Sequence, residues 1–328
     1  MLVVGSNGVG KTNLLEAIHV GGQGFSPRTR SDTELIRFGA TATRVALRGE
    51  RAGAAVEIEL TLRLGEGKRA KLNGAPLRAA EQLRARLDVL VFTPDRLVVV
   101  KGGPAVRRAY FDRTLGRLTP GRAGVPLEYG AALAQRNAAL RRVAAGLSAR
   151  PSVAPWTERV ATLGAQLVEA RRGVVSALAQ PLAELAAELG LPGLRLEYGA
   201  EPPTLDALEG RLERDLDRGA TSLGPHLDDV AVLAGSRDLR SFGSQGEQRL
   251  AVLSLILAEA ELLRQRHSSP PLLLLDDVLS ELDTDRRRRL AERISNQGQA
   301  MVTATSRSVL PLAPAQVVEI EALRTRGG

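Results

Sequence analysis

Residues 5–12 read Gly5-Ser6-Asn7-Gly8-Val9-Gly10-Lys11-Thr12. They follow an apolar stretch at residues 1–4 and precede a helix-like run at 13–20, so the context is strand, loop and helix. The glycines allow the backbone to curl, so that successive amide groups and the N-terminus of the next helix face bound phosphates. We expect Lys11 to contact the β- and γ-phosphates and Thr12 to bind Mg²⁺. The whole of residues 5–12 therefore predicts a binding site for ATP or a related nucleotide.

The bulk composition limits the class of protein. A chain of 328 residues, of which 44% are hydrophobic, exceeds the usual size of one core, so we expect at least two lobes. Cysteine is absent, which excludes disulfides and thiolate metal sites. The sequence contains neither an apolar run of membrane-spanning length nor the layout of a signal peptide. We therefore expect a cytoplasmic protein with no membrane partner.

The charge is positive and is carried almost entirely by arginine. The formal net charge is +8, and the lysines are Lys11, Lys68, Lys71 and Lys101. This balance suits a nucleic acid partner, although arginine could also simply replace lysine on ordinary surfaces. An aromatic content of 3% argues against single-strand binding by base stacking. Any DNA contact should therefore be made mostly to backbone phosphates.

The pattern of apolar residues changes along the chain. Alternation at residues 43–49, 54–64 and 68–73 predicts an antiparallel meander, and residues 87–92 predict a buried strand. Helical patterns follow at residues 104–118, 127–147 and 156–189, where Pro181 is expected to cause a kink. The polar face of these helices is expected to carry arginines that either follow a duplex or are merely solvated: Arg136, Arg141, Arg142, Arg171 and Arg172. Strands are expected again at residues 194–198, 230–233, 271–275, 299–303 and 317–320, with helices at 245–266 and 283–296.

A second candidate part of the nucleotide site lies near the end of the chain. Residues 272–277 read Leu272-Leu273-Leu274-Leu275-Asp276-Asp277, an apolar strand that ends in two acids. P-loop ATPases place their magnesium carboxylate at such a strand end. We expect Asp276 to hold Mg²⁺ through water and Asp277 to polarise the attacking water, and we include Lys11 with them as catalytic. Alternatively, Asp277 caps the following turn.

Most of the chain separates Lys11 from Asp276, which implies an insertion. Such a split is typical of ABC-type ATPases of the SMC class. Two motifs support this class: Gly243-Ser244-Gln245-Gly246-Glu247-Gln248 resembles the ABC signature, and Ser280-Glu281-Leu282-Asp283 resembles the D-loop. The resemblance gives Ser244, Gly246 and Asp283 a place in nucleotide binding across an ATP-dependent homodimer. A helix N-terminus with a serine is an incomplete anion site, and Ser244 could equally act as an ordinary N-cap.

We therefore expect an α/β fold, an ABC/SMC-type P-loop ATPase head with mixed sheets, flanking helices and an inserted α-helical arm. Residues 1–115 and 221–328 would form the two parts of the head, and residues 116–220 the arm.

Together the motifs resemble the RecF family of bacterial recombination mediator ATPases, over residues 5 to about 305. Further family-like stretches are Pro94-Asp95, Lys101-Gly102-Gly103-Pro104, Arg107-Arg108, Tyr110-Phe111-Asp112, Gly224-Pro225-His226-Leu227-Asp228-Asp229 and Phe242-Gly243-Ser244-Gln245-Gly246. The resemblance implies a clamp that dimerises on duplex DNA near single-strand gaps or junctions. It also implies that the clamp helps RecR and RecO to load RecA, and that weak DNA-dependent ATP hydrolysis opens the dimer. Gly224 to Asp229 would border the nucleotide region, with His226 in a structural role.

The chain departs from the family pattern at several points. Leu227 replaces an arginine, and residues 301–305 lack the switch histidine of transport-type ABC ATPases. The family has strands before the phosphate loop that approach the adenine, whereas this chain begins one short strand before Gly5. We therefore expect weaker ATP binding than in a chain that carries such upstream residues.

Other functions stay open at this point. They are a DNA-bridging protein that uses ATP as a structural ligand, the ATPase subunit of a transporter, and an unrelated phosphotransferase. The run Arg286-Arg287-Arg288-Arg289 would lie near the subunit interface of an ATP dimer or form a solvated helix face.

Overall fold

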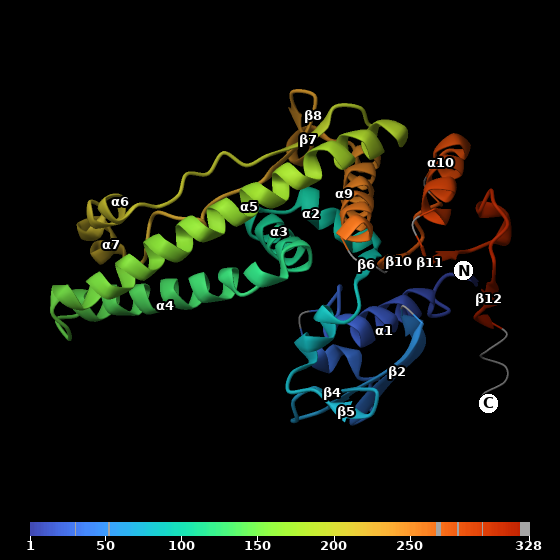
Figure 1. Cartoon of the computed structure of the whole chain (residues 1–328), viewed down its shortest axis with the longest axis horizontal. Coiled ribbons are helices and arrows are strands. Elements are labelled where there is room, and N and C mark those ends of the chain that lie inside the picture. The colour runs from blue at the N-terminus through green and yellow to red at the C-terminus, as the bar shows by residue number, and fades with distance from the viewer. Residues whose placement is uncertain (30, 52, 267–269, 281, 297, 322–328) are drawn as a thin grey trace. The chain divides into compact units, whose positions relative to one another are not determined.

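The structure is a computed structural model of the chain (Figure 1), and it describes residues 1–321 except 30, 52, 267–269, 281 and 297. The chain forms two compact units. The first consists of Met1–Leu97, Glu184–Pro192 and Ser244–Gly328, and the second of Val98–Ala183 and Gly193–Gly243. None of the helices within the described residues is long and apolar enough to span a membrane.

A parallel sheet forms the centre of the first unit. Its strands, in spatial order, are β12 (Val317–Glu319), β1 (Leu2–Val4), β11 (Ala300–Ala304), β10 (Leu272–Leu275) and β6 (Val89–Phe92). The strands are almost continuously apolar, as expected for parallel strands that are buried on both faces. Leu275 pairs with both Phe92 and Val302, so the next residue of β10, Asp276, lies level with Thr93 and Thr303 at the carboxyl edge.

Three helices accompany this sheet in the first unit. Helix α1 (Lys11–Gln23) ends at Gly24, whose φ of 75° is left-handed and whose N–H donates to the carbonyl of Val20 at 2.8 Å. Helix α9 (Gln245–Arg266) is buried without a break from Gln248 to Ala260, as a core helix should be. Helix α10 (Thr284–Ser295) begins at Asp283, whose carboxylate caps it by accepting the N–H of Arg286 at 2.9 Å.

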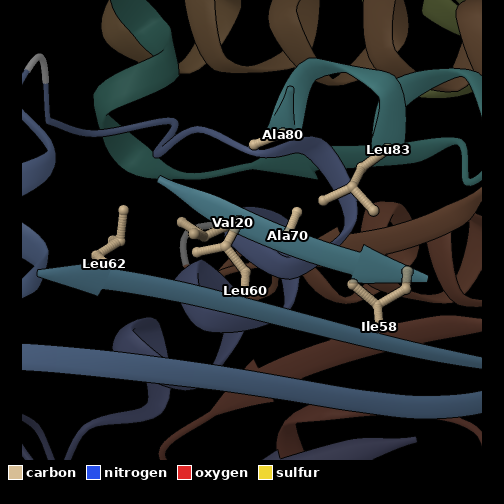
Figure 2. Packing of buried hydrophobic residues seen from close by; sticks show 7 residues of the cluster. All are labelled: Val20, Ile58, Leu60, Leu62, Ala70, Ala80 and Leu83. Atoms are coloured by element: carbon tan, nitrogen blue, oxygen red, sulfur yellow. The ribbon is translucent and has the colours of Figure 1, made fainter. Parts of the chain in front are cut away.

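The predicted antiparallel meander is confirmed. Strands β2 (Ala42–Arg51), β3 (Ala54–Arg63), β4 (Arg69–Leu72) and β5 (Ala75–Pro76) follow one another in the sheet. Alternate residues of β3 face inward, so Ile58, Leu60 and Leu62 pack with Val20 of α1 and Leu83 (Figure 2). Short 3₁₀ helices in the first unit are η1 (Asp32–Leu35), η2 (Ala80–Ala85), η3 (Pro94–Leu97) and η6 (Arg307–Val309).

The second unit is mainly helical. Its helices are α2 (Val98–Lys101), α3 (Pro104–Leu118), α4 (Val125–Ala144), α6 (Leu205–Glu209), α7 (Leu212–Arg218), α8 (Leu239–Phe242), η4 (Pro120–Arg122), η5 (Arg150–Val153) and most of α5 (Ala154–Glu188). Helices α4 and α5 lie beside each other (Figure 1), and α5 continues beyond Pro181 to Glu188. A small antiparallel sheet has the order β7 (Leu194–Glu197), β8 (Ala231–Ala234) and β9 (Arg237–Asp238).

The second unit differs from the expected arm at residues 116–220: it also includes α3 and residues up to Gly243, whereas Glu184–Pro192 belong to the first unit. Arg107 of α3 donates from Nε to Asp229 Oδ1 at 2.6 Å. Asp112, also of α3, accepts from Arg171 Nε at 2.7 Å. These contacts explain why α3 and the residues up to Gly243 cluster with the arm helices.

The prediction that the arm arginines share one polar face is wrong for Arg136 and Arg171. Arg136 is 0% exposed and donates to Asp215 at 2.7 Å and Thr221 at 2.8 Å. Arg171 is 3% exposed and donates to both carboxylate oxygens of Asp112. A guanidinium can be buried when a carboxylate and further acceptors surround it. Of the other three, Arg141 and Arg142 are exposed, and Arg172 pairs with Glu169 at 2.7 Å.

We expect Asp215→Ala to destabilise the protein by about 3–5 kcal/mol, because the substitution leaves the Arg136 guanidinium buried without its counter-ion. Glu169→Ala, which removes one of the two carboxylates that pair with the half-exposed Arg172, should cost less than about 1 kcal/mol. Equilibrium urea unfolding of both variants measures the difference. Equal losses would contradict the assignment of Arg136 and Asp215 as a buried pair.

Candidate nucleotide-binding site

The phosphate loop connects β1 to α1. Gly8 and Gly10 have φ values of 78° and 111°, which a residue with a side chain could adopt only with strain. Gly10 is the N-cap of α1, and no side chain caps the first turn. The uncapped amide groups and the positive end of the helix dipole together favour an anion. The loop therefore has the backbone geometry that a phosphate group requires.

Lys11 lies over this loop with its side chain largely buried. Its Nζ donates to the carbonyl of Gly5 at 2.5 Å and to that of Ser6 at 2.8 Å. Both acceptors are neutral, so the bonds fix the position of the ammonium group without cancelling its charge. An ammonium group held in this way can interact with the phosphates of a bound nucleotide.

The other loop residues differ in what they offer to a ligand. Gly5 continues the sheet, because its N–H donates to the carbonyl of Ala304 at 3.3 Å. Val9 is buried and packs with Val3, so its backbone is the part that is left to face a ligand. Asn7 is exposed. Ser6 donates its N–H to Glu321 Oε1 at 2.8 Å, and the pKa of Glu321 is lowered first by the Ser6 side chain, then by this backbone bond and by the charge of Lys11.

Asp276 lies at the end of β10 between two threonine hydroxyls. Thr12 Oγ1 donates to Oδ2 at 2.7 Å, and Thr303 Oγ1 donates to Oδ1 at 2.7 Å. The sequence predicted that Thr12 and Asp276 would meet. Thr303 was not predicted as part of the site. Its place there follows from the pairing of β11 with β10, in which Leu275 lies opposite Val302.

The residues around Asp276 fit a magnesium ion. The Thr12 hydroxyl uses its proton toward Asp276, which leaves its oxygen lone pairs for a cation, and Mg²⁺ usually takes one or two protein groups together with phosphate oxygens. No cluster of three or more His, Cys, Asp or Glu side chains that could hold a metal occurs among the described residues. Thr93, level with Asp276, has a buried hydroxyl for which the described residues provide no hydrogen-bond partner.

Asp277 has an unusual backbone conformation. Its φ is 48°, in the left-handed region that residues other than glycine rarely adopt, at a cost of order 1–3 kcal/mol. Its N–H donates to Thr303 Oγ1 at 2.9 Å, and its carbonyl accepts from Ser280 Oγ at 3.0 Å. Thr303 therefore holds both acids that follow β10: its hydroxyl donates to the Asp276 carboxylate and accepts the N–H of Asp277.

The signature-like motif begins α9 with a capping box. Ser244 N–H donates to Glu247 Oε2 at 2.8 Å, and Glu247 N–H donates to Ser244 Oγ at 3.2 Å. The N-cap interpretation of Ser244 is thus confirmed, and it does not exclude a role in nucleotide binding. Gly246 is exposed, and a Cβ placed there would meet nothing closer than Ser244 Oγ at 4.0 Å.

Of the D-loop-like motif, Glu281 lies outside the described residues. Asp283 is exposed, caps α10 and also pairs with Arg286 Nη1 at 3.4 Å. The carboxylate predicted to bind nucleotide is therefore bonded to its own helix in this structure.

The stretch Gly224 to Asp229 connects several elements of the second unit. Arg171 of α5 donates to the carbonyl of Pro225 at 2.7 Å, and Tyr198 donates to Asp228 Oδ2 at 2.7 Å. Leu227, at the position where the resemblance leads one to expect an arginine, is 58% exposed. These contacts give the stretch a clear structural function.

His226 is bonded at both ring nitrogens. Because a carbonyl can only accept, Nε2 donates to the carbonyl of Thr221 at 3.0 Å, and Nδ1 is left to accept from the Tyr129 hydroxyl at 2.7 Å. Burial lowers the pKa of His226 below its usual 6.5 and raises the pKa of Tyr129. His226 is therefore neutral at pH 7.

A phosphate loop between β1 and α1, two acids at the end of a parallel strand and a capped signature helix define this class of protein: a P-loop ATPase head of the ABC and SMC type. A profile described as the RecF/RecN/SMC N terminal domain matches residues 1–325. The chain belongs to the RecF family.

Similar proteins cover most of the chain. The DNA replication and repair protein RecF of Synechococcus sp. (strain JA-3-3Ab) is 36% identical over 323 residues, which are 93% of this chain and 84% of the relative. The protein of the same name from Anaeromyxobacter dehalogenans (strain 2CP-1 / ATCC BAA-258) is 38% identical over 329 residues, which are 94% and 87% of the two chains.

Solved structures agree with this assignment. The recombination mediator protein RecF-ATP in the RecFOR pathway matches with a TM-score of 0.87 and 27% identity, covering 97% of this chain and 88% of that chain. The Smc head domain of Pyrococcus yayanosii matches with a TM-score of 0.56 and 16% identity, covering 97% and 89%, which supports the fold alone.

The lowered pKa of His226 predicts a pH dependence of stability. Between the pKa of the folded state and 6.5 the unfolded chain binds more protons, so the free energy of unfolding should fall as the pH decreases through this window. Above the window this group contributes no pH dependence. When the pH is lowered from about 7.5 to about 5.5, the free energy of unfolding should fall less in His226→Gln than in the parent, because glutamine does not titrate. Thermal unfolding at both pH values tests this, and identical losses in the two proteins would refute it.

Proposed function

We propose that this chain is an ATP-dependent DNA-binding protein of recombinational repair. Two findings support the proposal: relatives that are named DNA replication and repair proteins, and a solved relative that is named a recombination mediator protein with ATP. The observation that carries it in this structure is the bond between Thr12 and Asp276, which joins the phosphate loop to the acidic strand end across 264 sequence positions.

In the nucleotide site, the loop amides and Lys11 would bind the phosphates of ATP. Thr12 and Asp276 would hold Mg²⁺, which neutralises charge on the β- and γ-phosphates when it is bound. Asp277 would orient the attacking water. Hydrolysis at such a site is expected to be slow, and its role would be to open a dimer.

The signature helix supports a site that is shared between two copies of the chain. Ser244 and Gly246 are exposed at the N-terminus of α9, where the helix dipole favours an anion. We propose that they contact the γ-phosphate bound by a second copy and that Asp283 lies at the same interface. The ATP-bound dimer would clamp duplex DNA near a single-strand gap or junction, with RecR and RecO as partners in loading RecA.

Light scattering with and without Mg-ATP and duplex DNA tests the shared site. The parent should change from monomer to dimer with ATP. Lys11→Met should lose nucleotide binding and dimerisation, whereas Ser244→Arg should bind nucleotide as a monomer, because the arginine blocks the interface. A Ser244→Arg protein that dimerises like the parent would exclude the shared site.

Asp277→Asn separates the clamp from a bridging protein that uses ATP as a structural ligand. The variant should accumulate as a DNA-bound dimer if hydrolysis opens the clamp. It should behave like the parent if ATP is never hydrolysed.

Thr303→Val should weaken the contribution of Mg²⁺ to nucleotide affinity by about tenfold, because the Asp276 carboxylate loses one hydrogen bond. Affinity for ATP without Mg²⁺ should stay unchanged. Thr305→Val, a substitution of an exposed threonine just beyond the same strand, is the matched control. Titration of labelled ATP with and without Mg²⁺ provides the measurement, and equal Mg²⁺ dependence in both variants would argue against a role of Thr303.

A further inference from the structure

The arginine run of α10 is not a uniform charged face. Arg288 is exposed and pairs with Asp285 at 3.7 Å and Glu292 at 3.9 Å, both in its own helix. Arg286, Arg287 and Arg289 instead reach backbone carbonyls outside the helix. Arg289 is exposed as well, so the run divides by contact and not by burial: Arg288 pairs within its own helix, and the other three contact other segments of the first unit.

The first of these segments is the C-terminus of α5. Gly190, with φ of 84°, ends the helix in a Schellman motif: its N–H donates to Ala187 O at 3.0 Å, and the N–H of Leu191 donates to Ala186 O at 2.7 Å. The carbonyl of Glu188 is not used by this motif and accepts from Arg289 Nη1 at 2.8 Å. Cations at a helix C-terminus also interact favourably with the helix dipole.

Arg286 lies against the same turn. Its Nη2 is 3.5 Å from the carbonyl of Gly190, at the long limit of a hydrogen bond. A Cβ added to Gly190 would lie 3.1 Å from both Nε and Nη2 of Arg286. The guanidinium group therefore packs on the glycine as well as facing its carbonyl.

The same arginines also hold the segment that follows the two acids of β10. Arg286 Nη1 pairs with Asp283 Oδ2 at 3.4 Å, and Arg287 Nη2 donates to the carbonyl of Ser280 at 3.2 Å. Ser280 Oγ in turn donates to the carbonyl of Asp277 at 3.0 Å. Helix α10 thus contacts the end of α5 through Arg286 and Arg289, and the segment beside Asp276 through Arg287 and Ser280, so its backbone connects the two sets of contacts.

The strained backbone of Asp277 lies at the end of the second set of contacts. A left-handed φ at a residue other than glycine persists only where surrounding contacts impose it. Here those contacts are the Thr303 hydroxyl on one side and Ser280 on the other. Loss of the bond from Ser280 would allow the backbone at Asp277 to relax. Because Arg287 of α10 holds the carbonyl of Ser280, the geometry of the two acids depends on α10.

We propose that Arg286, Arg287 and Arg289 are positioning residues, which anchor Asp277, Ser280 and Asp283 to the C-terminal carbonyls of α5. Nucleotide binding beside Asp276 then changes the stability of the hydrogen bonds at the C-terminus of α5, and those bonds in turn affect nucleotide binding, because coupling between two sites is reciprocal. The inference rests on the proposed nucleotide site. This positioning role differs from the two roles expected from the sequence, which were a subunit interface and a solvated helix face.

Hydrogen exchange of the full chain, with and without Mg²⁺ and the slowly hydrolysed analogue ATPγS, tests the coupling. In the parent, the analogue should slow exchange at residues 5–12 and also change exchange at residues 184–192. The Arg286→Ala/Arg289→Ala variant should keep the first effect and lose the second. Arg288→Ala, in the same helix, should keep both effects. The Arg286→Ala/Arg289→Lys variant should show part of the second effect that the double alanine variant loses, because lysine can still donate to the carbonyl of Glu188.

The outcomes separate the two proposals. If the analogue leaves residues 5–12 of the parent unchanged, the nucleotide site itself is refuted and the coupling with it. If residues 5–12 respond but residues 184–192 do not, or if the double variant responds like the parent at both, the nucleotide site stands and the anchoring role is overturned. Protection of residues 5–12 in the double variant also shows that the variant is folded.

Discussion

The hydrogen bond from the Thr12 hydroxyl to the Asp276 carboxylate is the constraint on which the rest of the first unit depends. It exists because β1 and β10 are separated in the parallel sheet by β11 alone, which places the loop after one strand beside the acids after the other. Thr303 completes the arrangement from the strand between them. The sequence between Thr12 and Asp276 must therefore fold so that the chain returns to the same sheet.

Local patterns predicted much of the fold. The first residues of α3 and α9 were predicted correctly, because Gly103-Pro104 and an N-cap serine at position 244 are short-range signals. The meander follows from alternation in β3, whose inward residues are apolar. The burial of Arg136 could not be predicted in the same way, because its partner Asp215 is 79 positions away and helical periodicity carries no information on such a pair.

The candidate site shows the same division. Residues 5–12 and the acids of β10 were found from sequence because each motif is contiguous. Thr303 and Glu321 were missed, since their importance comes from strand register and from one backbone amide of the loop. The stretch from Gly224 to Asp229 was noticed for its likeness to a family motif. Its contacts with Arg171, Tyr129 and Tyr198 show that a polar network connects it to helices and to the small sheet of the second unit.

The position of β1 has a consequence for the order of folding during translation. Strand β1 lies between β11 and β12 in the sheet, and both of these strands come much later in the chain. Residues 98–183 and 193–243 emerge well before either of them, and they form the second unit. Nascent chains should therefore acquire their helical unit early, while the apolar β1 waits unpaired for its neighbours. A chain with such non-local pairing folds its sheet late and is exposed to aggregation until β11 and β12 have been synthesised.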